Sequence, residues 1–190
     1  CNEDIALMRT IPNMVIINPA DDVEARAAVK AAYEHVGPVY LRFGRLATPV
    51  INDNPEYKFE LGKGVTLREG KDITIVATGL EVSFALEAAQ MLEKDGIDAR
   101  VINIHTIKPI DEEIIVKAAK ETKKIFTVEE HSIIGGLGSA VCDVVCEKQP
   151  APVYKIGMRD RFGESGPAME LLHKYELDAE GIYNQIKENM

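Results

Sequence analysis

The fold of this chain is constrained most by a regular alternation of short apolar runs with longer segments of helical periodicity. In the helical segments, apolar residues recur three and four positions apart. A chain of this pattern forms a mostly parallel sheet with helices on both faces, because each helix leads back to the start of the next strand. Beyond residue 56 the predicted strands are 64–68, 73–77, 100–104, 124–129 and 152–156, and the predicted helices are 81–94, 111–122, 137–148, 167–175 and 178–189.

A smaller unit of the same kind comes first in the chain. Residues 14–18 and 39–43 are predicted strands because both runs are apolar and rich in β-branched or aromatic side chains. Between them, Asp21 or Asp22 is placed to cap a helix that ends near His35. Strand, helix and strand together predict the last part of a parallel α/β unit, and we expect the rest of that unit to lie in a larger fold of which this chain is a piece.

The two units are separated by a stretch without periodicity. Residues 46–58 contain several proline, asparagine and aspartate residues, which favour turns and irregular backbone. We therefore place the boundary near Glu56. Residues 1–55 are then the truncated α/β unit with its linker, and residues 56–190 are a complete three-layer α/β/α domain.

Composition excludes several classes of function. The net charge is −9, which disfavours a protein that binds nucleic-acid phosphates. No apolar run approaches the ~20 residues that a membrane-spanning helix needs. Three cysteines do not make a disulfide framework, and this favours the reducing cytoplasm.

The end of strand 39–43 carries two arginines, Arg42 and Arg45, that flank Phe43 and Gly44. Ligands of parallel sheets gather at the carboxyl ends of the strands. Arg45 lies just past the strand, after a glycine that leaves the backbone open, so its guanidinium is placed to bind a phosphate or carboxylate. The alternative is a salt bridge at the surface or between domains.

Three further segments at strand ends carry polar side chains. Residues 129–139 read Glu-Glu-His-Ser-Ile-Ile-Gly-Gly-Leu-Gly-Ser, which could form an acid–base site or a phosphate-binding turn. We favour a structural interpretation, in which the glycines allow a tight turn and the charges face another domain or subunit. Residues 105–111 carry a histidine, a lysine and an aspartate, and the histidine is expected to be structural. Residues 159–166 carry two arginines and fit either an interface or a second anion site.

Taken together, these segments resemble transketolases. Residues 3–14, 18–21 and 37–45 resemble the latter part of the pyrimidine-binding domain of that family. Five further segments resemble the C-terminal domain of transketolases: Thr78-Gly79, Ile107–Asp111, Glu129–His131, Gly135–Ser139 and Asp160–Gly166. The ending Phe-Gly-Glu-Ser-Gly at 162–166 is more similar to transketolases than to related thiamine enzymes.

The resemblance implies a thiamine-diphosphate-dependent enzyme that moves a two-carbon ketol unit between sugar phosphates. Thiamine diphosphate and a divalent metal, Mg or Ca, would be held by a separate N-terminal section together with residues upstream of Cys1. The section described by this sequence would then hold no catalytic, cofactor-binding or metal-binding residue. We expect it to be inactive and free of thiamine diphosphate on its own, to assemble with the N-terminal section, and to form homodimers.

Two structural expectations also follow from the resemblance. Arg45 occupies the family position that clamps the substrate phosphate, counted from Gly37-Pro38. The C-terminal domain of the family has a five-stranded mixed sheet with one antiparallel strand, which we expect at residues 64–68.

Two alternatives stay open at this point. One is a piece of a related thiamine enzyme, either 1-deoxyxylulose-5-phosphate synthase or the β subunit of a 2-oxo acid dehydrogenase. The other is a non-catalytic α/β module for interaction or regulation, whose glycine-rich turn binds an anionic ligand.

Overall fold

The computed structural model describes residues 1–190 and contains the expected five-stranded sheet. Its strand order is β3-β5-β4-β7-β8. Strand β3 runs antiparallel to β5, and the other neighbours are parallel, so the expected mixed sheet with its single antiparallel strand is confirmed. The strands are β3 (Val65–Arg68), β4 (Ile73–Ala77), β5 (Ala99–Asn103), β7 (Ile125–Ser132) and β8 (Val153–Met158).

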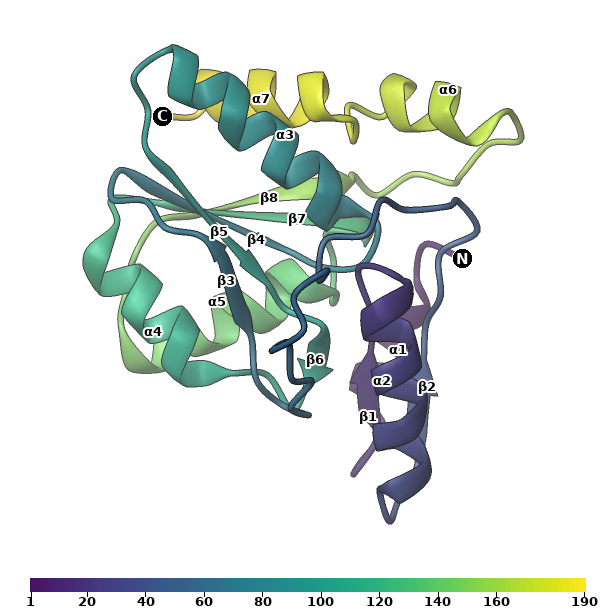
Figure 1. Ribbon diagram of the computed structural model, residues 1–190. Coiled ribbons are helices and arrows are strands. Elements are labelled where there is room, and N and C mark those ends of the chain that lie inside the picture. Colours follow the sequence, from purple (N-terminus) through teal and green to yellow (C-terminus); the bar gives the residue numbers. More distant parts are fainter.

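Helices cover both faces of this sheet, which confirms the three-layer architecture (Figure 1). Figure 1 shows α3 (Glu81–Lys94), α6 (Ala168–Lys174) and α7 (Ala179–Glu188) on one face. The opposite face is covered by α4 (Glu112–Glu121) and α5 (Leu137–Lys148). None of the helices has the length and apolar character needed to cross a membrane.

The core consists of two apolar layers, one on each side of the sheet. Successive residues of a strand point to opposite faces. Accordingly, Ile75 and Ala77 belong to the layer under α3 and α7, whereas Val76 belongs to the layer over α4 and α5. Every residue of β4 and β5 is buried, as expected of central strands covered on both faces.

The N-terminal unit contains the predicted strand, helix and strand, together with a first helix that the sequence pattern does not predict. The new helix, α1 (Asp4–Arg9), has only six residues, too few for apolar periodicity to show. Strand β1 (Val15–Ile17) pairs in parallel with β2 (Val39–Leu41), and α2 (Asp22–Glu34) connects them. Asp21 caps α2, since its side chain accepts the Glu24 N–H at 2.8 Å.

A third strand, from the larger domain, completes a separate three-stranded sheet with the N-terminal unit. Strand β6 (Thr106–Lys108) lies beyond residue 56 but pairs antiparallel with β1, giving the order β2-β1-β6. The sequence pattern predicts no strand here, because Ile107 is the single apolar residue between Thr106 and Lys108. The N-terminal unit is therefore docked on the larger domain by backbone pairing, and β1 has a neighbour on each side.

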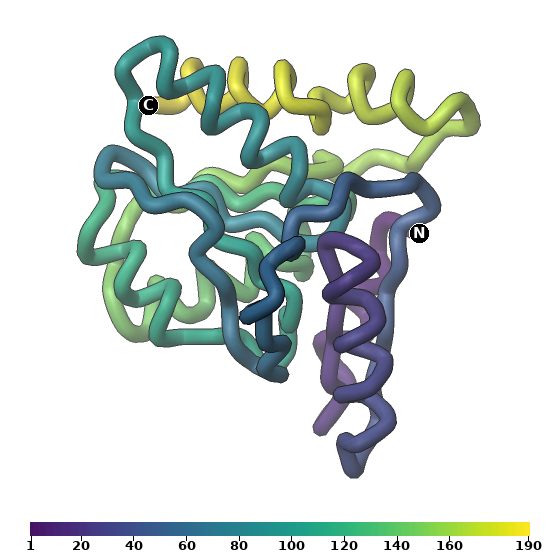
Figure 2. The backbone as a smooth tube through the Cα atoms, viewed as in Figure 1, coloured from purple at the N-terminus to yellow at the C-terminus, as the bar shows by residue number.

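The linker lies along the seam between the two units (Figure 2). The Asp21 carboxylate accepts the N–H groups of Ile51 and Asn52, at 2.8 and 2.7 Å. Farther along, the Tyr57 hydroxyl donates to Glu24 of α2 at 2.6 Å. At Gly79, where φ is +58°, a Cβ atom would lie 2.6 Å from the Asn18 side chain, so the close approach of the units requires glycine.

Candidate functional site

The loop that carries Arg45 lies where β1 and β2 end. The Arg45 side chain is exposed and makes no hydrogen bond or ion pair with the rest of the chain. A Cβ atom at neighbouring Gly44 would meet nothing within 4 Å, so this backbone is open on the side-chain side. A strand-end loop thus presents an arginine whose charge is not neutralised by any other group of this chain.

A crevice of about 290 Å³ lies between this loop and the start of α2. It is lined by Pro19–Asp22, Ala25, Phe43, Gly44, Leu46–Thr48 and Leu80, but not by Arg45 itself. Burial raises the pKa of Asp21, but the N–H donors of Glu24, Asn52 and Ile51 outweigh burial and lower the pKa below its usual value. The ionised Asp21 repels anions, so a phosphate bound by Arg45 belongs outside this crevice.

Arg42, unlike Arg45, forms salt bridges between the two units. Its side chain is only 12% exposed, and its Nε donates to Asp4 Oδ2 at 3.0 Å. Its Nη1 lies 3.6 Å from Glu130 Oε2, and its Nη2 donates to the Glu130 carbonyl at 2.9 Å. Arg42 therefore joins α1, β2 and β7 in the seam, and its charge is already neutralised.

The glycine-rich segment after β7 is structural. The fully buried Glu129 carboxylate accepts the N–H groups of Leu137 and Gly138, at 2.7 and 2.8 Å, and so caps α5. Burial raises the pKa of Glu129 to about 7, although these N–H groups, Lys155 and Arg9 lower it. Because the chain's own carboxylate occupies the N-terminus of α5, no phosphate can be bound there. The expected structural role of the glycine-rich turn therefore holds. Of the two carboxylates expected to face another domain, Glu130 does so and Glu129 does not.

His131 is buried and held in one tautomer. Its Nδ1 lies 2.7 Å from the Ser132 carbonyl and must donate, and its Nε2 accepts the Ala6 N–H at 3.3 Å. Burial lowers the pKa of His131, although the Ser132 carbonyl and Asp4 raise it. With no exposed surface, this imidazole fixes α1 against β7 rather than exchanging protons with a substrate.

Of the other two polar segments, residues 105–111 are held by contacts within the chain, whereas residues 159–166 are all exposed. His105 is fully buried and stacks on Phe59, with ring centroids 4.3 Å apart, and burial lowers its pKa to about 4. Lys108 donates to the Arg9 and Ile11 carbonyls at 2.8 and 2.6 Å. In the 159–166 loop, the Arg161 guanidinium lies 4.4 Å from the centre of the Tyr175 ring.

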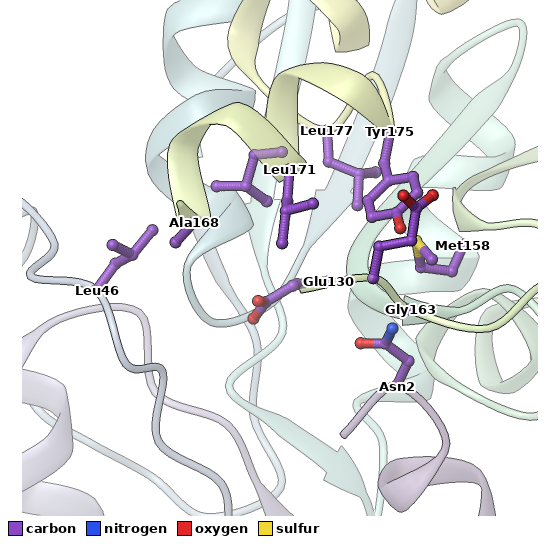
Figure 3. Close-up of a pocket in the computed structure, with 11 residues that line it drawn as sticks. Asn2, Leu46, Glu130, Met158, Gly163, Ala168, Leu171, Tyr175 and Leu177 are labelled. Carbon is purple, nitrogen blue, oxygen red and sulfur yellow. The ribbon is translucent and has the colours of Figure 1, made fainter. Parts of the chain in front are cut away.

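A second pocket, of about 150 Å³, lies between the end of β7 and α6 (Figure 3). Figure 3 shows Glu130 on one wall and Leu171, Tyr175 and Leu177 on the apolar side. The pocket is smaller than the roughly 300 Å³ at which ligand sites usually begin. No group of three His, Cys, Asp or Glu side chains in the chain could hold a metal ion.

Comparison with known proteins gives two family matches. Residues 62–182 match the model described as "Transketolase, C-terminal domain", and residues 2–50 match "Transketolase, pyrimidine binding domain". A solved structure described as "Split gene transketolase, inactive beta4 tetramer" is 50% identical with a TM-score of 0.94, and the match covers 99% of this chain and 61% of that one. A transketolase mutant from Pichia stipitis is 29% identical with a TM-score of 0.78, over 98% of this chain and 26% of that one.

Curated relatives carry related names. A Methanocaldococcus jannaschii protein named "Putative transketolase C-terminal section" is 48% identical, over 99% of this chain and 59% of its own length. An apulose-4-phosphate transketolase subunit of Phocaeicola vulgatus is 46% identical, over 94% of this chain and 57% of its own length. A 1-deoxy-D-xylulose-5-phosphate synthase of Heliobacterium modesticaldum is 38% identical, over 97% of this chain and 29% of its own length. The chain thus spans about three-fifths or less of the length of these relatives.

Proposed function

The chain belongs to the transketolase family, and on that premise we propose that it is part of the C-terminal section of a thiamine-diphosphate-dependent transketolase. The whole enzyme would transfer a two-carbon ketol unit between sugar phosphates. The observation that carries the proposal is the free guanidinium of Arg45 at the carboxyl ends of β1 and β2, within the segment that matches the pyrimidine-binding domain. Arg45 would bind the phosphate group of the substrate.

The proposal includes a partner section, because the described residues do not by themselves fit the cofactor. The α5 N-terminus, which could bind a pyrophosphate, is filled by Glu129, and no metal cluster is present. Thiamine diphosphate and its Mg or Ca ion would be held elsewhere, on an N-terminal section and upstream residues. We propose that this chain assembles with that section, forms homodimers and acts in the cytoplasm, for which its three free cysteines are suited.

The alternatives receive less support. Two transketolase subunits and a transketolase C-terminal section are 44–48% identical to this chain, whereas the synthase relatives are 37–40% identical. The synthase nevertheless stays the second candidate for the whole enzyme. A regulatory module that binds an anion at the glycine-rich turn loses its basis, since Glu129 occupies that turn.

A coupled transketolase assay tests the proposal. The full-length polypeptide, its N-terminal section, thiamine diphosphate and Mg²⁺ should all be needed for activity. Isolated residues 1–190 should show no micromolar binding of thiamine diphosphate in a calorimetric titration. Activity of the full-length polypeptide without its partner section, or micromolar binding to the isolated residues, would contradict the proposal.

In that assembly, Arg45→Ala tests the role of Arg45. A charge-assisted contact is worth roughly 1.5–3 kcal/mol, so kcat/KM for phosphorylated sugars should fall about ten- to a hundred-fold, mainly through KM. Hydroxypyruvate, a donor without phosphate, should be affected much less when the acceptor also lacks phosphate. The control is Arg26→Ala, which removes an exposed arginine paired only with Asp22 at 3.4 Å. Equal losses on both donors would show that Arg45 is structural.

A further inference from the structure

The Arg45 loop has almost no internal support. Residues 43–50 neither donate nor accept a hydrogen bond, in the backbone or through side chains. Hydrogen bonds hold the chain only on either side, at Arg42 and at Ile51. Within the loop, Leu46 packs partly against the core. The position of Arg45 is therefore determined largely by where its two ends are fixed.

The end nearer to Arg45 is fixed by Arg42. The Arg42 N–H donates to the Ile17 carbonyl at 2.9 Å, which continues the pairing of β2 with β1. Its guanidinium reaches Asp4 of α1 and Glu130 of β7. Asp4 is held in turn by the Tyr40 hydroxyl, at 2.8 Å. One side chain thus attaches the end of β2 to two elements, α1 and β7, that lie far apart in the sequence.

The two arginines have different electrostatic surroundings, although only two residues separate them. Arg42 is 12% exposed and lies beside two carboxylates, so its charge is neutralised within the chain. Arg45 is exposed and has no partner. An anion from solution would therefore be attracted to Arg45, and Arg42 would act on that anion only through the geometry of the loop.

We propose that Arg42 is a positioning residue, which sets the place of Arg45 by fixing the end of β2 to α1 and β7. The proposal rests on the role of Arg45 given under the proposed function. Three residues of chain span at most about 10 Å, and Gly44 has no side chain to add a further contact. A displacement of the Arg42 anchor therefore moves the nearer of the two fixed ends that limit where Arg45 can lie.

Two mild variants test this in the assembled full-length enzyme. Arg42→Lys keeps the positive charge. The lysine ammonium lacks the planar fork of the guanidinium, so it cannot contact Asp4 and Glu130 at the same time. Glu130→Gln weakens the 3.6 Å ion pair but keeps the backbone carbonyl that accepts from Arg42. The matched control is Arg100→Lys, which alters an equally buried arginine, 8% exposed, that pairs with Glu69 and Glu121 in the larger domain.

The readouts are the inhibition constant of inorganic phosphate and the kinetics with two donors. Displacing a binding group by about 1 Å can cost up to ~100-fold, so Arg42→Lys should weaken phosphate inhibition and raise KM for phosphorylated donors by roughly ten-fold. Glu130→Gln should change both in the same direction but less. For hydroxypyruvate, kcat and KM should stay close to the wild-type values. In the Arg45→Ala background, Arg42→Lys should have little further effect on phosphate inhibition.

The failures of the two proposals can be told apart. If Arg45→Ala weakens phosphate inhibition and Arg42→Lys does not, the positioning role is wrong while the phosphate role of Arg45 stands. Equal losses of kcat on both donors for Arg42→Lys, as a purely structural residue would give, also overturn the positioning role. If Arg45→Ala itself leaves phosphate inhibition unchanged, both proposals fall.

Discussion

At the scale of single residues, Glu81 is the most unusual group in the chain. It begins α3, is fully buried, and neither carboxyl oxygen has a hydrogen-bond partner. Burial raises its pKa well above the usual value, and the charges of Glu130 and Asp178 raise it further, while Arg42 lowers it. Burial therefore favours the neutral form of the Glu81 carboxyl group in the folded chain.

The raised pKa makes stability depend on pH. Above the ordinary pKa of 4.5, the unfolded chain releases the Glu81 proton, whereas the folded chain holds it until the pH approaches the raised pKa. Stability is consequently lost as pH rises from that value toward the folded pKa. Glu81→Gln should remove this loss, so the variant should melt above wild type at pH 8 and near it at pH 4.5. For a chain of this length, each kcal/mol corresponds to roughly 2–4 °C.

Melting curves of residues 1–190 across this pH range measure the effect. Glu87→Gln, an exposed position on the same helix, serves as the control and should show no such trend. A difference between Glu81→Gln and wild type that stays constant from pH 4.5 to pH 8 would contradict the raised pKa of Glu81.

Sequence patterns could identify candidate residues but not their partners. The place of Arg45 at a strand end follows from periodicity and from the glycine before it. In contrast, the neutralisation of Arg42 depends on Asp4, 38 positions earlier, and on Glu130, 88 positions later. Likewise, Glu129 becomes the cap of α5 only because the end of β7 lies beside the start of that helix. Such pairings depend on tertiary structure, which spacing along the chain does not reveal.

At the scale of elements, sequence patterns predict the elements that have a clear apolar run or period and miss two that lack one. The buried strands β4 and β5 and the helices α3 and α5 all lie within a residue or so of their predicted bounds. The six-residue α1 and the three-residue β6 are missed, whereas β1 and β2, also of three residues, are predicted because their runs are apolar throughout. Both are held by contacts with the other unit, namely His131 with α1 and β1 with β6.

The turn before α5 offers a test at this scale. A Cβ atom at Gly136 would lie 2.0 Å from Glu129 Oε2 and 2.6 Å from His131 Nδ1, so Gly136→Ala must displace the carboxylate that caps α5. Losing a helix cap costs about 1–2 kcal/mol, and the melting temperature should fall accordingly. Gly44→Ala is the matched control, because its Cβ atom would meet nothing within 4 Å. Equal melting temperatures for the two variants would disprove the cap.

At the scale of the whole molecule, the two units are joined by a buried polar seam as well as by β6. Glu24 of α2 is fully buried and accepts from the Ala20 N–H, the Tyr57 hydroxyl and the Asn103 amide, at distances from 2.6 to 3.1 Å. Asn103 ends β5, so this carboxylate links the N-terminal unit, the linker and the larger sheet. The domain boundary near Glu56 stays a prediction. How independently the two units unfold depends on the strength of this seam.

Glu24→Ala should loosen the N-terminal unit without unfolding the larger domain. The change leaves the buried Asn103 amide without an acceptor, at a cost of about 1–3 kcal/mol, and frees Tyr57 of the linker. The larger sheet keeps its two apolar layers, so opening should be local. Hydrogen exchange should speed up at the amides of β1 and β6 and stay slow at those of β4 and β7. Glu34→Ala, at an exposed position on the same helix, is the control. If protection falls equally in all four strands, the two units form a single cooperative domain, and a boundary near Glu56 has no thermodynamic meaning.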